Sequence, residues 1–237
     1  VAIVNGEVAE LGNRVNGFGN FNYNWGAAIV WFANKDRLFT GNEIKKGDAI
    51  VGLRETGFRS NGLSLVRKIL QENILQSDWH NFYRDGGNKT VGEEVLTPSK
   101  IYSKAVVDMF GGWNMDRKPK VEVHGVAHIT GGGLPGKLGR ILKPSGLGAD
   151  IYNPFMPSDI MDFVQKSGNA SDEEAYKTWN MGQGMVVITP DPEKVQEIAA
   201  KYRIGAGLIG NIVENPGIRI TSKGISSKGK ELYFKVE

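Results

Sequence analysis

The sequence contains no cysteine among its 237 residues. This absence excludes thiol nucleophiles, disulfides, iron–sulfur clusters and cysteine-ligated zinc sites. It also lacks the run of about 18 apolar residues that a membrane-spanning helix needs, and its first four residues are not the basic start of a signal peptide. We therefore expect a cytoplasmic protein with no membrane partner.

Charge of one sign is not in large excess either. The 29 basic and 26 acidic residues are mixed along the chain and leave a formal charge of +3. Proteins that bind nucleic acid through a basic face cluster their lysines and arginines, so we expect no nucleic-acid partner. With 40% apolar and 23% charged residues, the composition is that of an ordinary domain large enough to bury a core.

Glycine is the residue in excess. The chain has 32 glycines, about twice the usual share of roughly 7%, and no collagen-like repeat accounts for them. Twelve of them fall in residues 52–62, 131–136, 182–184 and 205–210. Glycine tolerates backbone conformations that other residues avoid, so we expect these glycines to serve local geometry.

Apolar strands and helical segments alternate along the chain. Strands are predicted at residues 27–33 (buried on both faces), 49–53, 121–129, 149–152, 185–189, 206–213, 218–222 and 231–236. Helices are predicted at residues 63–70, 100–110, 133–142, 158–166, from 171 onwards, and 191–202. Ser60 or Asn61 is the expected N-cap of the first, and Ser171 with Glu174 forms a capping-box pattern at the start of the fifth. The order predicts an α+β (mixed α/β) fold with helices on one side of a mixed sheet, and a domain boundary that separates residues 1–46 from 47–237.

Two glycine-rich segments share one arrangement, in which a strand ends, a turn follows and a helix begins. They are Arg59-Ser60-Asn61-Gly62 and His128-Ile129-Thr130-Gly131-Gly132-Gly133. A helix N-terminus presents unpaired N–H groups, and glycines let an anion approach the backbone. Each segment alone is more simply a tight turn, but two in one domain favour an anionic ligand such as a phosphate. The planar guanidinium of Arg59 suits phosphate oxygens.

Candidate metal ligands are few. His124 and His128 share one face of a predicted strand but lie about 13 Å apart, too far to bind one metal ion, and His80 has no partner in sequence. We therefore expect no zinc site. Glu7 and Glu10 would be Mg²⁺ ligands if their segment faces a nucleotide, although a solvated turn is the simpler reading. The sequence has no P-loop, nucleophile elbow or zinc-protease motif.

Five segments together resemble one enzyme family in order and spacing. They are Gly6-Glu7-Val8-Ala9-Glu10, Gly52-Leu53 with Ser60-Asn61-Gly62-Leu63-Ser64, Leu96-Thr97-Pro98-Ser99-Lys100-Ile101-Tyr102, Ala127-His128-Ile129-Thr130-Gly131-Gly132-Gly133-Leu134-Pro135, and Asn180-Met181-Gly182-Gln183-Gly184-Met185. The family is aminoimidazole ribonucleotide synthetase (phosphoribosylformylglycinamidine cyclo-ligase). The resemblance covers almost the whole chain.

The resemblance implies a ligase of de novo purine biosynthesis. Such an enzyme uses ATP and Mg²⁺ to activate the formyl oxygen of formylglycinamidine ribonucleotide and closes the ring of aminoimidazole ribonucleotide. It implies a homodimer in which residues 1–46 end an N-terminal ATP-binding domain and residues 47–237 form the C-terminal α+β domain. The family's earlier ATP-binding motifs have no match here, so we expect the chain to be inactive alone and to need that N-terminal half, in the same or a separate chain.

The resemblance also assigns site residues. It places Arg59, Ser60 and Asn61 in the catalytic segment, Gly6 and Glu7 at the nucleotide with Glu7 as a Mg²⁺ ligand, and the substrate or its phosphate at Gly62, His128, Thr130, Gly131, Gly132 and Gly133. The family usually has histidine where this chain has Arg59. Arginine binds phosphate but is no base near pH 7, so we expect a binding role for Arg59.

Two alternatives stay open. One is a related ATP-dependent enzyme of the same superfamily, acting in hydrogenase maturation, selenophosphate synthesis, thiamine phosphate phosphorylation or the preceding amidotransferase step. The Ser-Asn-Gly and His-Ile-Thr-Gly-Gly-Gly segments argue against it. The other is a non-catalytic phosphate-binding or interaction subunit, which Arg59 and the unmatched N-terminal motifs favour.

Overall fold

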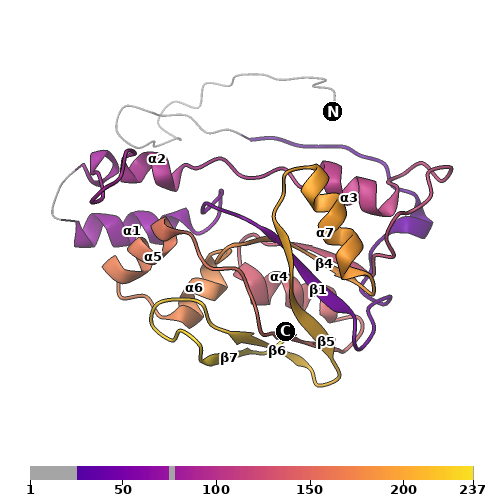
Figure 1. Ribbon diagram of the computed structural model, residues 1–237. Coiled ribbons are helices and arrows are strands. Elements are labelled where there is room, and N and C mark those ends of the chain that lie inside the picture. Colours follow the sequence, from indigo (N-terminus) through magenta and orange to yellow (C-terminus); the bar gives the residue numbers. More distant parts are fainter. Residues whose placement is uncertain (1–25, 75–77, 237) are drawn as a thin grey trace. The chain divides into compact units, whose positions relative to one another are not determined.

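The strands form one seven-stranded sheet in the order β2-β4-β1-β5-β3-β6-β7. Figure 1 labels β1, β4, β5, β6 and β7 of this sheet. The computed structural model describes residues 26–74 and 78–236, so the predictions for Gly6, Glu7 and Glu10 lie outside the described residues. The strands are β1 (Ala49–Arg54), β2 (Gly125–His128), β3 (Gly148–Ile151), β4 (Gln183–Thr189), β5 (Ala206–Val213), β6 (Gly217–Thr221) and β7 (Glu231–Phe234). The β3–β6 pair is parallel and the other pairs are antiparallel. The predicted mixed α/β fold is confirmed.

Helices fill the connections from β1 to β5, whereas β5, β6 and β7 follow one another without a helix. The helices are α1 (Leu63–Asn73), α2 (Val91–Val95), α3 (Ser103–Phe110), α4 (Gly133–Leu142), α5 (Asp159–Ser167), α6 (Asp172–Thr178) and α7 (Pro192–Lys201), with short 3-10 turns at Lys35–Arg37 and Trp79–Asn81. Ser171 is the N-cap of α6, and its side chain accepts from the Glu174 N–H at 3.2 Å, which is one of the two hydrogen bonds of the predicted capping box. None of the described helices has the length and apolar character needed to cross a bilayer.

Helices cover both faces of the sheet, so the prediction of one covered face is wrong. Ile50 of β1 belongs to a core with residues of α1, α4, α5 and α6. Val51 and Leu53 belong to a second core with α3 and α7, which pack against each other (Figure 1). Side chains alternate between the faces of a strand, so the unbroken apolar run of β1 already required cover on both.

The strand predicted at residues 27–33 is also wrong. Residues 26–32, the described part of a separate unit that ends at Phe32, have no regular secondary structure. Val30 and Phe32 are 86% and 84% exposed. A strand that is apolar on both faces forms only where neighbours pair with its backbone and cover its side chains, and no described residue pairs with this segment.

Smaller differences lie at the element starts. The N-cap of α1 is Gly62, not Ser60 or Asn61, because the turn needs a φ of 71° that glycine adopts without strain. β2 begins at Gly125 rather than at residue 121. Strand pairing, which the alternation pattern does not report, sets that boundary.

Candidate functional site

The two predicted glycine turns lie side by side. Arg59, which follows β1, donates from Nη1 to the carbonyl oxygens of Ile129 and Gly184, both at 2.9 Å. Its Nη2 contacts Nε2 of His128. A Cβ built on Gly131 would lie 3.7 Å from Oδ1 of Asn61. Residues 59–62 and 128–133 therefore form one candidate site, which the sequence alone did not show.

The sheet order explains why these turns meet. β1 and β2 both pair antiparallel with β4, so they run parallel to each other on its two sides. Their carboxyl ends therefore reach the same edge of the sheet, where β4 begins at Gln183. Arg54 pairs with Gln183, and His128 pairs with Met185. The segment of residues 180–185 thus joins the same site.

Each turn leads into a helix without a side-chain cap. The N-cap residues of α1 and α4 are Gly62 (φ 71°) and Gly132 (φ 92°), and no side chain of the described structure accepts a hydrogen bond from either helix start. The first N–H groups of a helix have no partner inside it and carry partial positive charge. At α4 the Gly133 N–H is donated to the Thr130 carbonyl oxygen and Pro135 has no N–H. The start of α1 and the remaining N–H groups of the α4 turn favour an anionic ligand such as phosphate.

The end of α6 packs against both turns. Trp179 donates from Nε1 to the Gly62 carbonyl oxygen at 3.3 Å, and a Cβ on Gly62 would lie 2.6 Å from Cδ1 of Trp179. A Cβ on Gly133 would overlap the carbonyl oxygen of Tyr176. Glycine is therefore required at both helix starts, and α6 fixes their relative position.

A buried carboxylate that the sequence analysis missed holds Arg59 in place. Glu55 is 1% exposed, and its Oε2 lies 3.6 Å from Nε of Arg59. The same carboxylate accepts from the Tyr102 hydroxyl at 3.0 Å and the Lys100 N–H at 3.2 Å. Burial and the negative charge of Glu55 raise the pKa of Tyr102, so the phenol stays a donor. The signal was an acid directly after a buried strand, four residues before Arg59.

Arg59 connects the elements of the site. Its side chain is 7% exposed, its φ of 66° is rare outside glycine, and both of its Nη atoms have protein partners. It therefore holds the two turns together. The direct contact between Arg59 and a ligand that we expect from the sequence stays a prediction.

His128 is neutral near pH 7. Partial burial, and then the positive charge of Arg59, lower its pKa. Arginine has only donors, so Nε2 of His128 must accept from Arg59 and the ring proton must be on Nδ1. His128 therefore has an Nδ1–H donor available for an oxygen atom.

The remaining predicted residues line the turns with different exposure. Ser60, Gly131 and Gly132 are exposed. Asn61, Gly62 and Thr130 are half-buried, and Gly133 is buried with its N–H donated to the Thr130 carbonyl at 2.9 Å.

Metal ligation finds no support in the described ranges. They hold no group of three or more histidine, aspartate or glutamate residues placed for a metal ion, and Glu7 lies outside them. His124 is buried with Nδ1 2.7 Å from Asp48 and Nε2 2.8 Å from Glu122. Burial lowers the pKa of His124, but these two hydrogen bonds outweigh it and raise the pKa overall. This histidine joins Asp48, the residue before β1, to the segment before β2.

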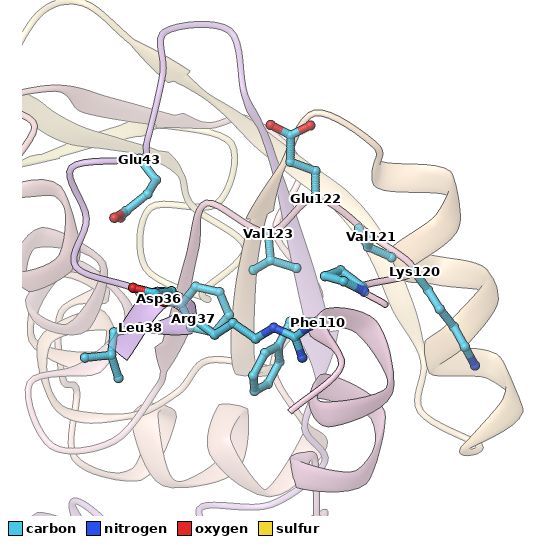
Figure 2. Close-up of a pocket in the computed structure, with 11 residues that line it drawn as sticks. Asp36, Arg37, Leu38, Glu43, Phe110, Lys120, Val121, Glu122 and Val123 are labelled. Atoms are coloured by element: carbon cyan, nitrogen blue, oxygen red, sulfur yellow. The ribbon is translucent and has the colours of Figure 1, made fainter. Parts of the chain in front are cut away.

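A hollow of about 470 Å³ lies elsewhere in the chain and is lined by residues 36–39, 43, 110 and 119–123 (Figure 2). It shares no residue with the candidate site. Its cations already have partners, because Arg37 donates to carbonyl oxygens of residues 112–117 and Lys120 binds Asp108 at 2.8 Å. Figure 2 shows Arg37 extended beside Phe110. These contacts hold the segment before β1 in place and indicate no particular ligand.

Comparisons with known proteins show the family to which the chain belongs. The family model described as AIR synthase related protein, C-terminal domain, matches residues 45–223. The phosphoribosylformylglycinamidine cyclo-ligase of Methanosarcina barkeri is 39% identical over 220 residues, which are 93% of this chain and 59% of that relative. The cyclo-ligase of Methanocaldococcus jannaschii is 39% identical over 219 residues, which are 91% of this chain and 57% of that relative. The chain thus spans less than two thirds of the length of these relatives.

A solved structure supports the fold alone. The hydrogenase maturation protein HypE of E. coli superposes with a TM-score of 0.51 at 15% identity, over 84% of this chain and 53% of that chain.

Proposed function

The chain belongs to the family described as AIR synthase related protein, C-terminal domain, and we propose that it supplies the substrate-facing domain of a phosphoribosylformylglycinamidine cyclo-ligase. The reaction is the ATP-dependent closure of formylglycinamidine ribonucleotide to aminoimidazole ribonucleotide in purine biosynthesis. The relatives that share 39% identity with this chain carry the cyclo-ligase name.

The observation that carries the proposal is the meeting of two uncapped helix starts, α1 and α4, joined by the contact between Arg59 and His128. The substrate is a ribonucleotide, and its phosphate fits the N–H groups there. Gly132 keeps the backbone open to it, since the nearest atom to a Cβ there would be Cα of Gly136 at 3.8 Å. Ser60, Asn61 and Thr130 supply hydroxyl and amide groups around the same edge.

The chain's own residues orient the reacting group. The Nδ1–H of neutral His128 donates to an oxygen of the substrate, and Arg59 fixes the tautomer that makes this possible. Glu55 and Tyr102 hold Arg59 in turn. Catalysis of this kind rests on positioning and on neutralising negative charge rather than on a base supplied by Arg59.

ATP and Mg²⁺ belong to the proposal as well. When bound, ATP would supply the phosphoryl group that activates the formyl oxygen, and Mg²⁺ would neutralise its charge. The uncapped helix starts fit a phosphate, whereas the described residues offer no acidic cluster for Mg²⁺. We place the nucleotide at Gly6 and Glu7, with Glu7 as a Mg²⁺ ligand.

The chain acts with a further domain in this proposal. We assign residues 1–46 to the end of an N-terminal ATP-binding domain and residues 47–237 to the C-terminal domain, which the start of the family match at residue 45 supports. The rest of the N-terminal domain is supplied by the same or a separate chain, and the assembly is a cytoplasmic homodimer. The 237-residue chain alone does not close the ring.

Ligand binding tests the phosphate part of the proposal. Calorimetry would compare formylglycinamidine ribonucleotide with the ribonucleoside that lacks its phosphate. We expect the ribonucleotide to bind at least tenfold more tightly. Equal affinities would show that the helix starts do not hold the phosphate.

A further inference from the structure

A groove of about 880 Å³ follows one side of α4. Gly132, Gly136 and Arg140 line it at intervals of four residues, and Gly139 and Lys143 do the same. Residues spaced by four lie on one face of a helix, so the groove runs along α4 from its start to its end. The opposite wall includes Lys177 of α6 and residues 233–235, at the end of β7.

The groove carries positive charge without a counter-charge among the described residues. Arg140, Lys143, Lys177 and Lys235 line it, and none of the described residues that line it is acidic. None of the four has an ion pair with any residue that the structure describes. Other lysines of the chain are paired, such as Lys201 with Glu197 at 2.8 Å. Four cations around one concavity repel each other and attract an anion.

Glycines keep the α4 side of the groove open. A Cβ on Gly136 would meet nothing within 4 Å, and the nearest atom to a Cβ on Gly132 would be Cα of Gly136 at 3.8 Å. Empty space therefore lies directly over the backbone of α4. A ligand can approach that backbone closely, which larger residues would prevent.

Two aromatic residues complete the lining, the buried Phe234 and the exposed Tyr233. Tyr233 is 55% exposed and lies in the same groove as the four cations. Exposed aromatic rings next to cations suit a ligand with a flat group joined to phosphates. The volume is within the range of small-molecule sites, roughly 300–1,000 Å³.

We propose that this groove binds a small molecule that carries two or more linked phosphate groups. The site is additional to the candidate site, since the two share Gly132 but all four cations lie outside residues 59–62 and 128–133. The proposal does not depend on ring closure. It predicts a second anion-binding event on the same chain.

Calorimetric titration of the 237-residue chain with tripolyphosphate tests the proposal. We expect binding that the double variant Lys143→Gln with Lys177→Gln weakens at least tenfold. Gly136→Asp, which puts a negative charge in the open space without touching the cations, should weaken binding as strongly. The matched control Lys68→Gln removes an exposed lysine of α1 outside the groove and should leave binding unchanged.

Three results would overturn the proposal. The first is that tripolyphosphate does not bind. The second is that the folded groove variants bind it as tightly as the unchanged chain does. The third is that Arg59→Gln abolishes binding while the groove variants keep it. Circular dichroism shows that each variant is folded. A parallel titration with ATP separates the sources of phosphate. If ATP binds more tightly than tripolyphosphate and Tyr233→Ala removes that difference, the groove is assigned to a nucleotide.

Discussion

The guanidinium of Arg59 and the imidazole of His128 are in direct contact, although 69 positions separate them in the chain. The contact joins the turn after β1 to the end of β2. It also decides which nitrogen of His128 carries the proton, because arginine can only donate. One pair of side chains thus links the fold to the chemistry of the candidate site.

The first prediction concerns the pKa of His128. Partial burial, and then the charge of Arg59, lower this pKa. Arg59→Gln removes the positive charge, so the pKa of His128 should rise towards the ordinary value of about 6.5. An NMR pH titration of the histidine ring measures it. Arg67→Gln, on the exposed side of α1, is the control and should leave the pKa unchanged. An unchanged pKa in Arg59→Gln would mean that the contact does not govern His128.

The second prediction compares two glycines with nearly the same backbone conformation. Gly62 has a φ of 71° and Gly86 a φ of 72°. Alanine costs about 1 kcal/mol in this left-handed region. A Cβ on Gly86 meets nothing within 4 Å, whereas a Cβ on Gly62 would lie 2.6 Å from Trp179. Gly62→Ala should therefore lower the free energy of unfolding by roughly 1–3 kcal/mol more than Gly86→Ala does.

Urea denaturation of the two alanine variants measures this difference. Equal losses of stability would show that α6 does not restrict the turn at Gly62. A larger loss in Gly86→Ala would contradict the packing of Trp179 against α1.

The third prediction concerns the buried carboxylate of Asp172. It accepts hydrogen bonds from Ser222 at 2.5 Å, from Ser226 at 2.7 Å and from the Ser227 N–H at 2.9 Å. Asp172→Ala leaves these donors without their acceptor and should cost about 3 kcal/mol of stability. The exposed Asp85 is the control, since Asp85→Ala should change stability little.

The same carboxylate makes stability depend on pH. Burial raises the pKa of Asp172, but hydrogen bonds from Ser222 and Ser226 outweigh it and lower the pKa overall. Its contribution is therefore present above the pKa of the unfolded chain, about 3.9, and is lost as pH falls through the lower pKa of the folded state. Denaturation of wild type and Asp172→Asn should differ most near neutral pH and converge in acid. A difference that does not shrink in acid would contradict this assignment.

Much of the fold was predictable from the sequence because local patterns determine it. The apolar runs of β1, β4 and β5 and the start of α7 at Pro192 all report on nearby residues. Residues 27–33 carry an equally apolar run yet form no strand, because a strand also needs a partner that the pattern does not report.

The candidate site was only half predictable. The glycine turns could be found from their composition, but their contact depends on β1 and β2 pairing with opposite sides of β4. Glu55 was missed because a buried acid reads as an ordinary residue at the end of a strand until its partners Arg59 and Tyr102 are placed beside it.

The measurement that tests the central claim most directly is ATP-dependent formation of aminoimidazole ribonucleotide. The chain would be joined to the part of the Methanosarcina barkeri relative that it does not match, and product and ADP would be quantified. We predict ring closure by the joined protein and none by the 237-residue chain alone. In the joined protein, His128→Ala should lower the rate of ring closure at least tenfold. His128→Asn, which retains an N–H donor, should restore part of that rate. A folded, ATP-binding joined protein that forms no product would contradict the proposed function, as would turnover by the chain alone.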